Sequence, residues 1–268
     1  MLKFANAKIN IGLHVTERRA DGYHNLETIF YPVKIYDAVE IQSAETLSME
    51  IHGSELKADD DNLCLRAYRL LATDFDLPAV KIHLLKRIPI GAGLGGGSSD
   101  ASATLQLLND QFKLGITDTR LEAYAAQLGA DCPFFIQNKA TYAEDIGTKL
   151  SPIDLDLSAY YIVLLKPDIH ISTAEAYKNV TPLTPQIDLR RAVQLPIQEW
   201  KLIIKNDFET GLFELYPQIA EIKRRFYELG AIYSSMTGSG SAVFAIFEQE
   251  TDVSELNALG QVYLPMDL

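Results

Sequence analysis

The segment from Pro89 to Ser99, PIGAGLGGGSS, restricts more than any other feature how this chain can fold. Five glycines within seven positions permit backbone conformations with φ > 0 and let other groups approach the main chain closely. The apolar strand pattern VKIHLLKRI precedes the run, and a helical pattern through Leu108 follows it, with N-cap chemistry predicted at Ser98-Ser99-Asp100. A helix start with exposed N–H groups attracts anions, so the run predicts a phosphate-binding loop rather than a flexible linker.

Two familiar phosphate-binding motifs fit this run poorly. Gly91, Gly93 and Gly96 satisfy GxGxxG, but a dinucleotide-binding fold requires a second strand ending in an acidic residue about 20 positions on, and two helical patterns follow instead. A Walker A loop requires a lysine after its last glycine, and Gly97 stands there. The loop therefore predicts phosphate binding of another type.

The composition indicates an ordinary globular protein that acts in the cytoplasm. The formal net charge of -12 argues against nucleic acid or an anionic membrane surface as the main partner. Cys64 and Cys132 form no CxxC or Cys/His cluster, which predicts two reduced thiols. The N-terminus lacks the pattern of a signal peptide, and no apolar run approaches a membrane span. No spacing among the five histidines suggests a metal site, so no protein metal ligands are predicted.

The chain divides into two predicted domains, residues 1–153 and 154–268, at a polar, proline-containing stretch. The pattern of the first half predicts strands followed by helices, with a short strand at Phe134-Phe135-Ile136. The pattern of the second half predicts the order strand–helix–strand–strand–helix–strand, with an amphipathic helix over 218–229 and another helix near 253–259. This order is that of a ferredoxin-like domain.

Several segments resemble the GHMP kinases, a family of small-molecule kinases. PIGAGLGGGSSDASATL resembles their second motif, and SMTGSGSAVFAIF resembles their third. Four further segments resemble the branch that acts on a cytidine-diphosphate-linked methylerythritol in the non-mevalonate isoprenoid pathway: FANAKINIGLHV, RRADGYHNLETIF, LGADCPFF and KNDFE. The resemblance implies an α+β fold of two domains, an N-terminal one like domain 2 of ribosomal protein S5 and a ferredoxin-like C-terminal one.

The resemblance also implies roles for individual residues. Asp131 is expected to be the catalytic base that takes the proton of the acceptor hydroxyl, and Lys8 to be its catalytic partner. Lys8 lies in an otherwise apolar strand, where its charge is costly to bury unless it is paired. The ATP loop is expected to comprise Pro89, Ile90, Gly91, Ala92, Gly93, Leu94, Gly95, Gly96, Gly97, Ser98 and Ser99. The substrate residues are expected to be Asn10, Tyr23, His24, Tyr177, Gly238 and Gly240, with cytosine stacked on the two tyrosines.

The implied reaction is phosphorylation of the 2-hydroxyl of that cytidine diphosphate substrate by ATP. Mg²⁺ is expected to be held largely by phosphate oxygens and water, since no acidic pair suggests a cage. A monomer or weak homodimer without nucleic-acid or membrane partners is expected. Two alternatives remain: another GHMP kinase acting on homoserine, mevalonate or a sugar, and a non-catalytic nucleotide-binding module on the same fold.

Overall fold

The computed structural model describes residues 1–267 of the chain. Two compact units divide it. Unit 1 comprises Met1–Ala7, Ile35–Ile90 and Gly95–Lys139, and unit 2 comprises Lys8–Lys34, Gly91–Leu94 and Ala140–Leu268. Strands β1 (Leu2–Arg18) and β2 (His24–Ser43) contribute to both units. This division is discontinuous along the chain, and the boundary near residue 153 stays a prediction.

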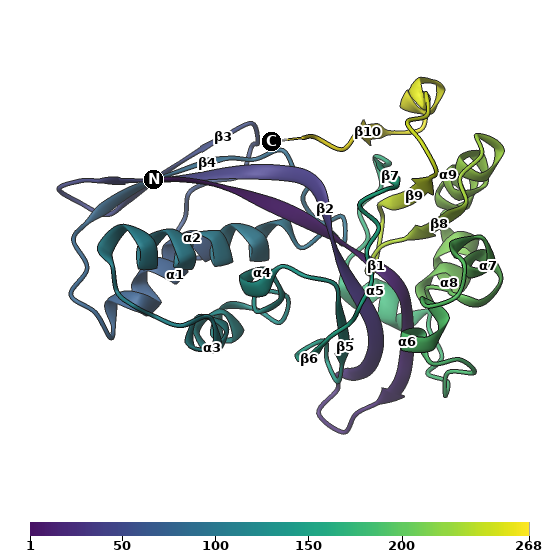
Figure 1. Ribbon diagram of the computed structural model, residues 1–268, viewed down its shortest axis with the longest axis horizontal. Coiled ribbons are helices and arrows are strands. Elements are labelled where there is room, and N and C mark those ends of the chain that lie inside the picture. Colours follow the sequence, from purple (N-terminus) through teal and green to yellow (C-terminus); the bar gives the residue numbers. More distant parts are fainter. Residues whose placement is uncertain (268) are drawn as a thin grey trace. The chain divides into compact units, whose positions relative to one another are not determined.

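Unit 1 is a small sheet covered by helices on one face (Figure 1). The end of β2 pairs antiparallel with β4 (Val80–Leu85), which pairs in parallel with β3 (Ser48–His52). A parallel pair needs a crossover, and α1 (Leu63–Ala72) supplies it. The remaining helices are α2 (Gly96–Phe112), α3 (Asp118–Leu128) and α4 (Phe134–Gln137).

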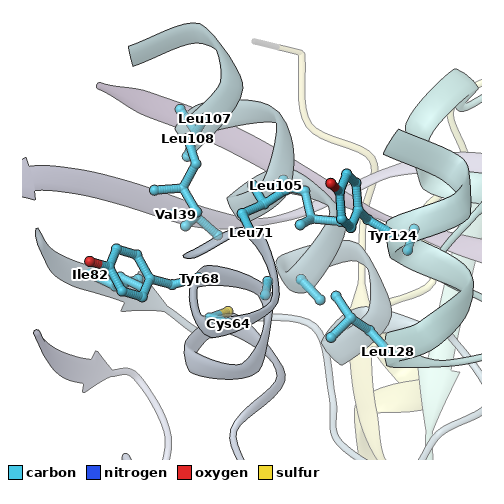
Figure 2. Close-up of a cluster of buried hydrophobic side chains, with 14 of the residues drawn as sticks. Val39, Cys64, Tyr68, Leu71, Ile82, Leu105, Leu107, Leu108, Tyr124 and Leu128 are labelled. Atoms are coloured by element: carbon cyan, nitrogen blue, oxygen red, sulfur yellow. The ribbon is translucent and has the colours of Figure 1, made fainter. Parts of the chain in front are cut away.

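Alternation along the strands builds the core of unit 1. Val39 on β2 and Ile82 on β4 point toward the helices and are fully buried, together with Leu71 of α1 and Leu105 of α2 (Figure 2). The residues between them on the strands face the opposite side of the sheet. The helices therefore leave one face of the sheet uncovered by this core.

Local chemistry explains where three of the helices begin. Asn62 caps α1, because its side chain accepts a hydrogen bond from Cys64 N at 2.9 Å. The N-cap predicted at Ser98-Ser99-Asp100 is wrong: α2 begins at Gly96, and Gly95 in the left-handed region precedes it. The strand predicted at 134–136 is also wrong. That segment is the single turn α4, where Pro133 fits the first position of a helix and the phenylalanines are buried.

Unit 2 contains a four-stranded antiparallel sheet formed by β7 (Tyr161–Lys166), β8 (Tyr233–Met236), β9 (Val243–Phe247) and β10 (Gln261–Tyr263). The strand order β10-β7-β9-β8 confirms the predicted ferredoxin-like arrangement (Figure 1). The helix expected over 253–259 is a 3₁₀ helix, η1 (Ser254–Ala258). The start of β2 pairs with β5 (Thr141–Glu144), which pairs with β6 (Lys149–Pro152).

Five helices accompany this sheet: α5 (Thr173–Lys178), α6 (Leu189–Ala192), α7 (Ile197–Ile203), α8 (Phe208–Leu215) and α9 (Pro217–Glu228). The predicted amphipathic helix is α9, which buries Ile219, Ile222 and Phe226. Leu13 and Val15 of β1 pack into the same core. Within residues 1–267, no helix combines the length and apolar character that crossing a membrane requires.

Candidate active site

The glycine loop adopts the backbone conformations that its sequence predicts. Gly91, Gly93 and Gly95 have φ angles of 63°, 77° and 67°, a region that side chains disfavour. No side chain caps the start of α2, and its first turn carries no acidic residue. The first N–H groups of this helix and its dipole therefore suit an anion such as a phosphate.

A second glycine turn, between β8 and β9, packs directly against Gly93 within unit 2. A Cβ atom on Gly93 would lie 2.3 Å from the carbonyl oxygen of Thr237, and one on Gly238 would lie 3.1 Å from Cα of Gly93. The hydroxyl of Thr237 donates to Gly93 O at 3.3 Å. Gly240 also has a positive φ, 87°, and a Cβ there would meet Met236 Sδ at 2.7 Å. The two turns therefore approach as closely as they do only because Gly93 and Gly238 lack side chains, and Gly240 leaves room for Met236.

Lys8 and Asn10 lie side by side on β1, as period-two alternation predicts, in a buried polar network. Lys8 is only 4% exposed; its Nζ donates to Asn10 Oδ1 at 2.8 Å and lies 4.5 Å from the ring centre of Phe30. Asn10 Nδ2 donates to Thr28 Oγ1, and Asn10 N to Thr237 Oγ1. The backbone N of Lys8 also donates to Leu94 O of the glycine loop at 3.0 Å. β1 is thus bonded to both glycine turns.

Asn206 fixes the second glycine turn, a role that sequence reasoning missed. Its Nδ2 donates to the carbonyl oxygens of Met236 and Gly238, each at 2.9 Å. The neighbouring Asp207 accepts from Val15 N through its carboxylate, and its own N donates to Leu13 O. The KNDFE segment, for which the sequence showed only a family resemblance, therefore holds β1 and the turn after β8 in register.

Asp131 lies half-buried in the turn between α3 and α4, and this turn rests against α2 within unit 1. Ser102 Oγ is 2.9 Å from Ser98 O and 2.7 Å from Cys132 O. Gln106 Nε2 donates to Ile136 O at 3.0 Å. Side chains of α2 thus hold the segment that carries Asp131 beside the predicted phosphate residue Ser98.

A buried charge cluster flanks the glycine loop in unit 1, and sequence reasoning missed it. Lys86 Nζ donates to Asp100 Oδ2 at 2.8 Å and to Asp37 Oδ2. Asp37 Oδ1 accepts from the backbone N of Arg87 and of Ile88. The cluster therefore ties the chain entering the loop to the second turn of α2.

The ionisation of this cluster follows from its burial. Burial raises the pKa of Asp100 to about 7, against the opposing effect of Lys86. Burial disfavours the charged form of Lys86, but the carboxylates of Asp100 and Asp37 outweigh it and raise the pKa of Lys86. The Oδ1 atom of Asp100 is buried without a hydrogen-bond partner, as a protonated carboxyl tolerates better than a carboxylate does. Burying one ion pair and one neutral carboxyl costs less free energy than burying these groups in any more highly charged state.

A cavity of about 770 Å³ in unit 2 gathers three predicted substrate residues, Tyr23, His24 and Tyr177. The rings of His24 and Tyr177 stack at 4.5 Å and 17°, and Tyr23 is 63% exposed. Arg18 and Lys178 line the same cavity. Burial, and secondarily the charge of Arg18, lowers the pKa of His24, which keeps its imidazole neutral. The cavity combines aromatic faces with two cations.

Comparisons with known proteins identify the fold family. The GHMP kinases N terminal domain family matches residues 62–139, and the GHMP kinases C terminal family matches residues 192–262. A mevalonate kinase structure from Methanococcus jannaschii superposes with a TM-score of 0.75 at 14% identity, covering 100% of this chain and 98% of its own. That identity shows the fold alone. The predicted GHMP kinase fold is confirmed, and it defines the class: small-molecule kinases with ATP as phosphoryl donor.

Proteins with higher sequence identity to this chain identify the family within this class. The 4-diphosphocytidyl-2-C-methyl-D-erythritol kinase of Bacteroides thetaiotaomicron is 50% identical over 260 residues, which are 95% of either chain. A crystal structure titled 4-(cytidine 5'-diphospho)-2C-methyl-D-erythritol kinase matches with a TM-score of 0.85 at 32% identity, covering 98% of both chains. At this identity and coverage, the chain belongs to the family of 4-diphosphocytidyl-2-C-methyl-D-erythritol kinases.

The close approach at Gly93 generates a first prediction. Gly93→Ala is expected to lower kcat/KM for ATP at least ~10-fold, because the added Cβ would push the glycine loop off Thr237. Gly115→Ala is the matched control: Gly115 also has a positive φ, 67°, but nothing lies within 4 Å of its Cβ position. It should lose about 1–2 kcal/mol of unfolding free energy and retain its kinetics. Equal kinetic losses in both variants would contradict the close-approach argument.

The cluster around Asp100 generates a second prediction. Folded Asp100 holds its proton up to about pH 7, whereas an ordinary aspartate releases it near 3.8. This group therefore stabilises the fold at low pH, and the contribution is lost as the pH rises from about 4 to 7. Asp100→Asn should flatten that part of the pH profile of the unfolding free energy, measured by urea denaturation. Asp110→Asn, an exposed change on α2, should leave the profile unaltered; parallel profiles for all three proteins would disprove the raised pKa.

Proposed function

We propose that this chain transfers the γ-phosphoryl group of ATP to the 2-hydroxyl of 4-diphosphocytidyl-2-C-methyl-D-erythritol. The observation that carries the proposal is the cavity in unit 2, where Tyr23, His24 and Tyr177 lie with Arg18 and Lys178. Aromatic faces stack on a nucleobase, and the cations suit a diphosphate. Mevalonate and homoserine carry neither group. The names of relatives at 50% and 49% identity support the same acceptor.

The pairing of His24 with Tyr177 suggests how the base is recognised. A neutral imidazole carries both a hydrogen-bond donor and an acceptor, which match the edge of cytosine. The lowered pKa of His24 favours this neutral form near pH 7. The exposed ring of Tyr23 offers a further stacking face in the same cavity. Together these residues select a planar pyrimidine rather than a simple alcohol.

We assign the transfer step to the glycine loop, Asp131 and Lys8. Phosphoryl transfer depends mainly on positioning and charge neutralisation, which the N–H groups at the start of α2 provide for the ATP phosphates. Asp131 acts as the general base toward the acceptor hydroxyl, as the family resemblance implies. Lys8, a buried cation anchored to Asn10, stabilises negative charge in the transition state.

Magnesium belongs to this proposal as the ion that would neutralise negative charge on the ATP phosphates. The donor set fits a loosely held ion: Ser98 is half-buried at the start of α2 and offers a hydroxyl, whereas Ser99 is buried. Among residues 1–267, no group of three histidine, cysteine or acidic side chains gathers at the glycine loop. The protein would therefore contribute hydroxyl and backbone groups, with phosphate and water completing the coordination.

Three further expectations remain part of the proposal. We place the reaction in the cytoplasm, in keeping with two free buried cysteines. We also expect a monomer or weak homodimer, which sedimentation tests, and a domain boundary near residue 153, which limited proteolysis tests.

Acceptor selectivity tests the proposal directly. Purified protein with ATP and Mg²⁺ should phosphorylate the cytidine-linked methylerythritol and leave mevalonate, homoserine and galactose unreacted. Turnover of one of those alcohols instead would assign the chain to another GHMP activity, and no turnover of any acceptor would favour a nucleotide-binding module.

The general base can be tested by removing its charge. Asp131→Asn should lower kcat at least ~10²-fold while the affinity for ATP stays nearly constant, since the amide keeps the shape but accepts no proton. Isothermal titration with an ATP analogue and steady-state kinetics measure the two effects. Asp110→Asn serves as the matched control and should retain its kcat. An unchanged kcat in Asp131→Asn would remove this residue from the mechanism.

The stacking assignment predicts a selective effect on one substrate. Tyr23→Ala should raise the KM for the cytidine substrate by about 5- to 150-fold, the equivalent of 1–3 kcal/mol of stacking, and change the KM for ATP little. Leu202→Ala, which removes a side chain that is 71% exposed on α7, is the control. Equal changes in both KM values would refute the assignment.

A further inference from the structure

The face of the unit 1 sheet opposite α1 and α2 carries a cluster of metal-ligating side chains. Met49 and Ile51 of β3 pack toward the core, so Glu50 and His52 point to the other face. On β4, Ile82 and Leu84 are buried, and His83 points outward between them. The parallel register places Glu50 directly opposite His83, which brings one carboxylate and two imidazoles together on two hydrogen-bonded strands.

The distances within this cluster suit a single ion. Glu50 Oε2 lies 3.4 Å from His83 Nδ1 and 3.9 Å from His52 Nε2, and the three ligand atoms lie within 4.8 Å of one another. In a tetrahedral zinc site with bonds of about 2.0–2.1 Å, neighbouring ligand atoms are about 3.3–3.4 Å apart. The side chain of His52 is 57% exposed, so a small rotation of its ring can bring it to that spacing.

Lys81 supports the cluster and leaves the ligand atoms accessible. Its Nζ pairs with Glu50 Oε1 at 2.5 Å, whereas the two histidines approach Oε2. A ligating carboxylate is usually held by such a second partner, which fixes its orientation. The rings of His52 and His83 lie nearly parallel, at 8°, with centres 6.3 Å apart. The cluster is therefore organised by its strands and by one ion pair before any ion arrives.

We propose that Glu50, His52 and His83 form a binding site for a divalent transition-metal ion, with Zn²⁺ as the representative ion and water in the fourth position. Imidazole and carboxylate ligands suit zinc, nickel and copper, whereas Mg²⁺ prefers oxygen ligands in octahedral geometry. The site is thus separate in chemistry from the magnesium of phosphoryl transfer, and it does not depend on the proposed function. The expectation of no protein metal ligands, drawn from sequence spacing, overlooked it because His52 and His83 meet only through the β3–β4 pairing.

Metal titration tests the proposal. The metal-stripped full chain should be titrated with Zn²⁺ by isothermal titration calorimetry. The wild type should show one more zinc-binding site than the variant Glu50→Gln/His52→Ala/His83→Ala. The single changes His52→Ala and His83→Ala should each weaken that site at least ~10-fold. Substitution with Co²⁺ should give the visible absorption of a tetrahedral ion in the wild type alone. Millimolar Mg²⁺ should leave the zinc affinity unchanged.

Two controls make the outcome decisive. His170→Ala removes an exposed histidine elsewhere in the chain and should leave the zinc site intact. Lys81→Ala leaves the three ligands in place and removes the ion pair that holds Glu50. The zinc affinity of this variant should differ from that of the wild type, and the site itself should remain. All substituted side chains are at least partly exposed, so the variants are expected to fold, which circular dichroism checks. Zinc affinity in the triple variant equal to that of wild type, or binding at millimolar Zn²⁺ only, would overturn the proposal.

Discussion

A lysine ammonium held between two buried acidic side chains is the interaction on which the glycine loop depends. Lys86 reaches Asp100 in α2 and Asp37 in β2, and Asp37 in turn accepts from the backbone just before the loop. Burying such charges costs stability compared with apolar packing. The structural effect of this cluster is to fix the chain both before and after the glycine run. A Cβ on Gly96 would lie 2.9 Å from Lys86 Nζ, so this glycine is also required for the cluster.

Unit 2 fixes the middle of the same loop by close backbone approach rather than by charge. Gly93 rests on the carbonyl of Thr237, Asn206 holds the turn beyond Thr237, and Lys8 N bonds Leu94 O. The contacts of Gly93 and of Lys8 N join main-chain atoms, which cannot change rotamer, and the side-chain amide of Asn206 donates to two main-chain carbonyls. A loop held this way is preorganised for the phosphate binding that we propose, and preorganised donors contribute most to stabilising charge as it develops.

Features that depend on residue type or element order could be predicted from the sequence, whereas features that depend on contacts between distant residues could not. Positive φ angles at Gly91 and Gly93 follow from glycine itself, and the strand order of the ferredoxin-like half follows from element order. The strand expected at 134–136 failed because local preference for β structure gave way to burial against α2 and α3. The cluster of Lys86 and Asp37 joins residues 49 positions apart, and no local pattern encodes such a pairing. Pairing of Lys8 with an acid such as Asp131 stays a prediction.

The course of β1 has a consequence for how the protein is made. Leu13 and Val15 belong to the core of unit 2, whose strand β9 ends only at Phe247. Ribosomes add about 5–20 residues per second, so these two apolar side chains emerge tens of seconds before the sheet that buries them is complete. The nascent chain must keep its first strand from aggregating during that interval. Folding of unit 2 therefore cannot finish until β9 has been synthesised, long after Leu13 and Val15 of the same core have emerged.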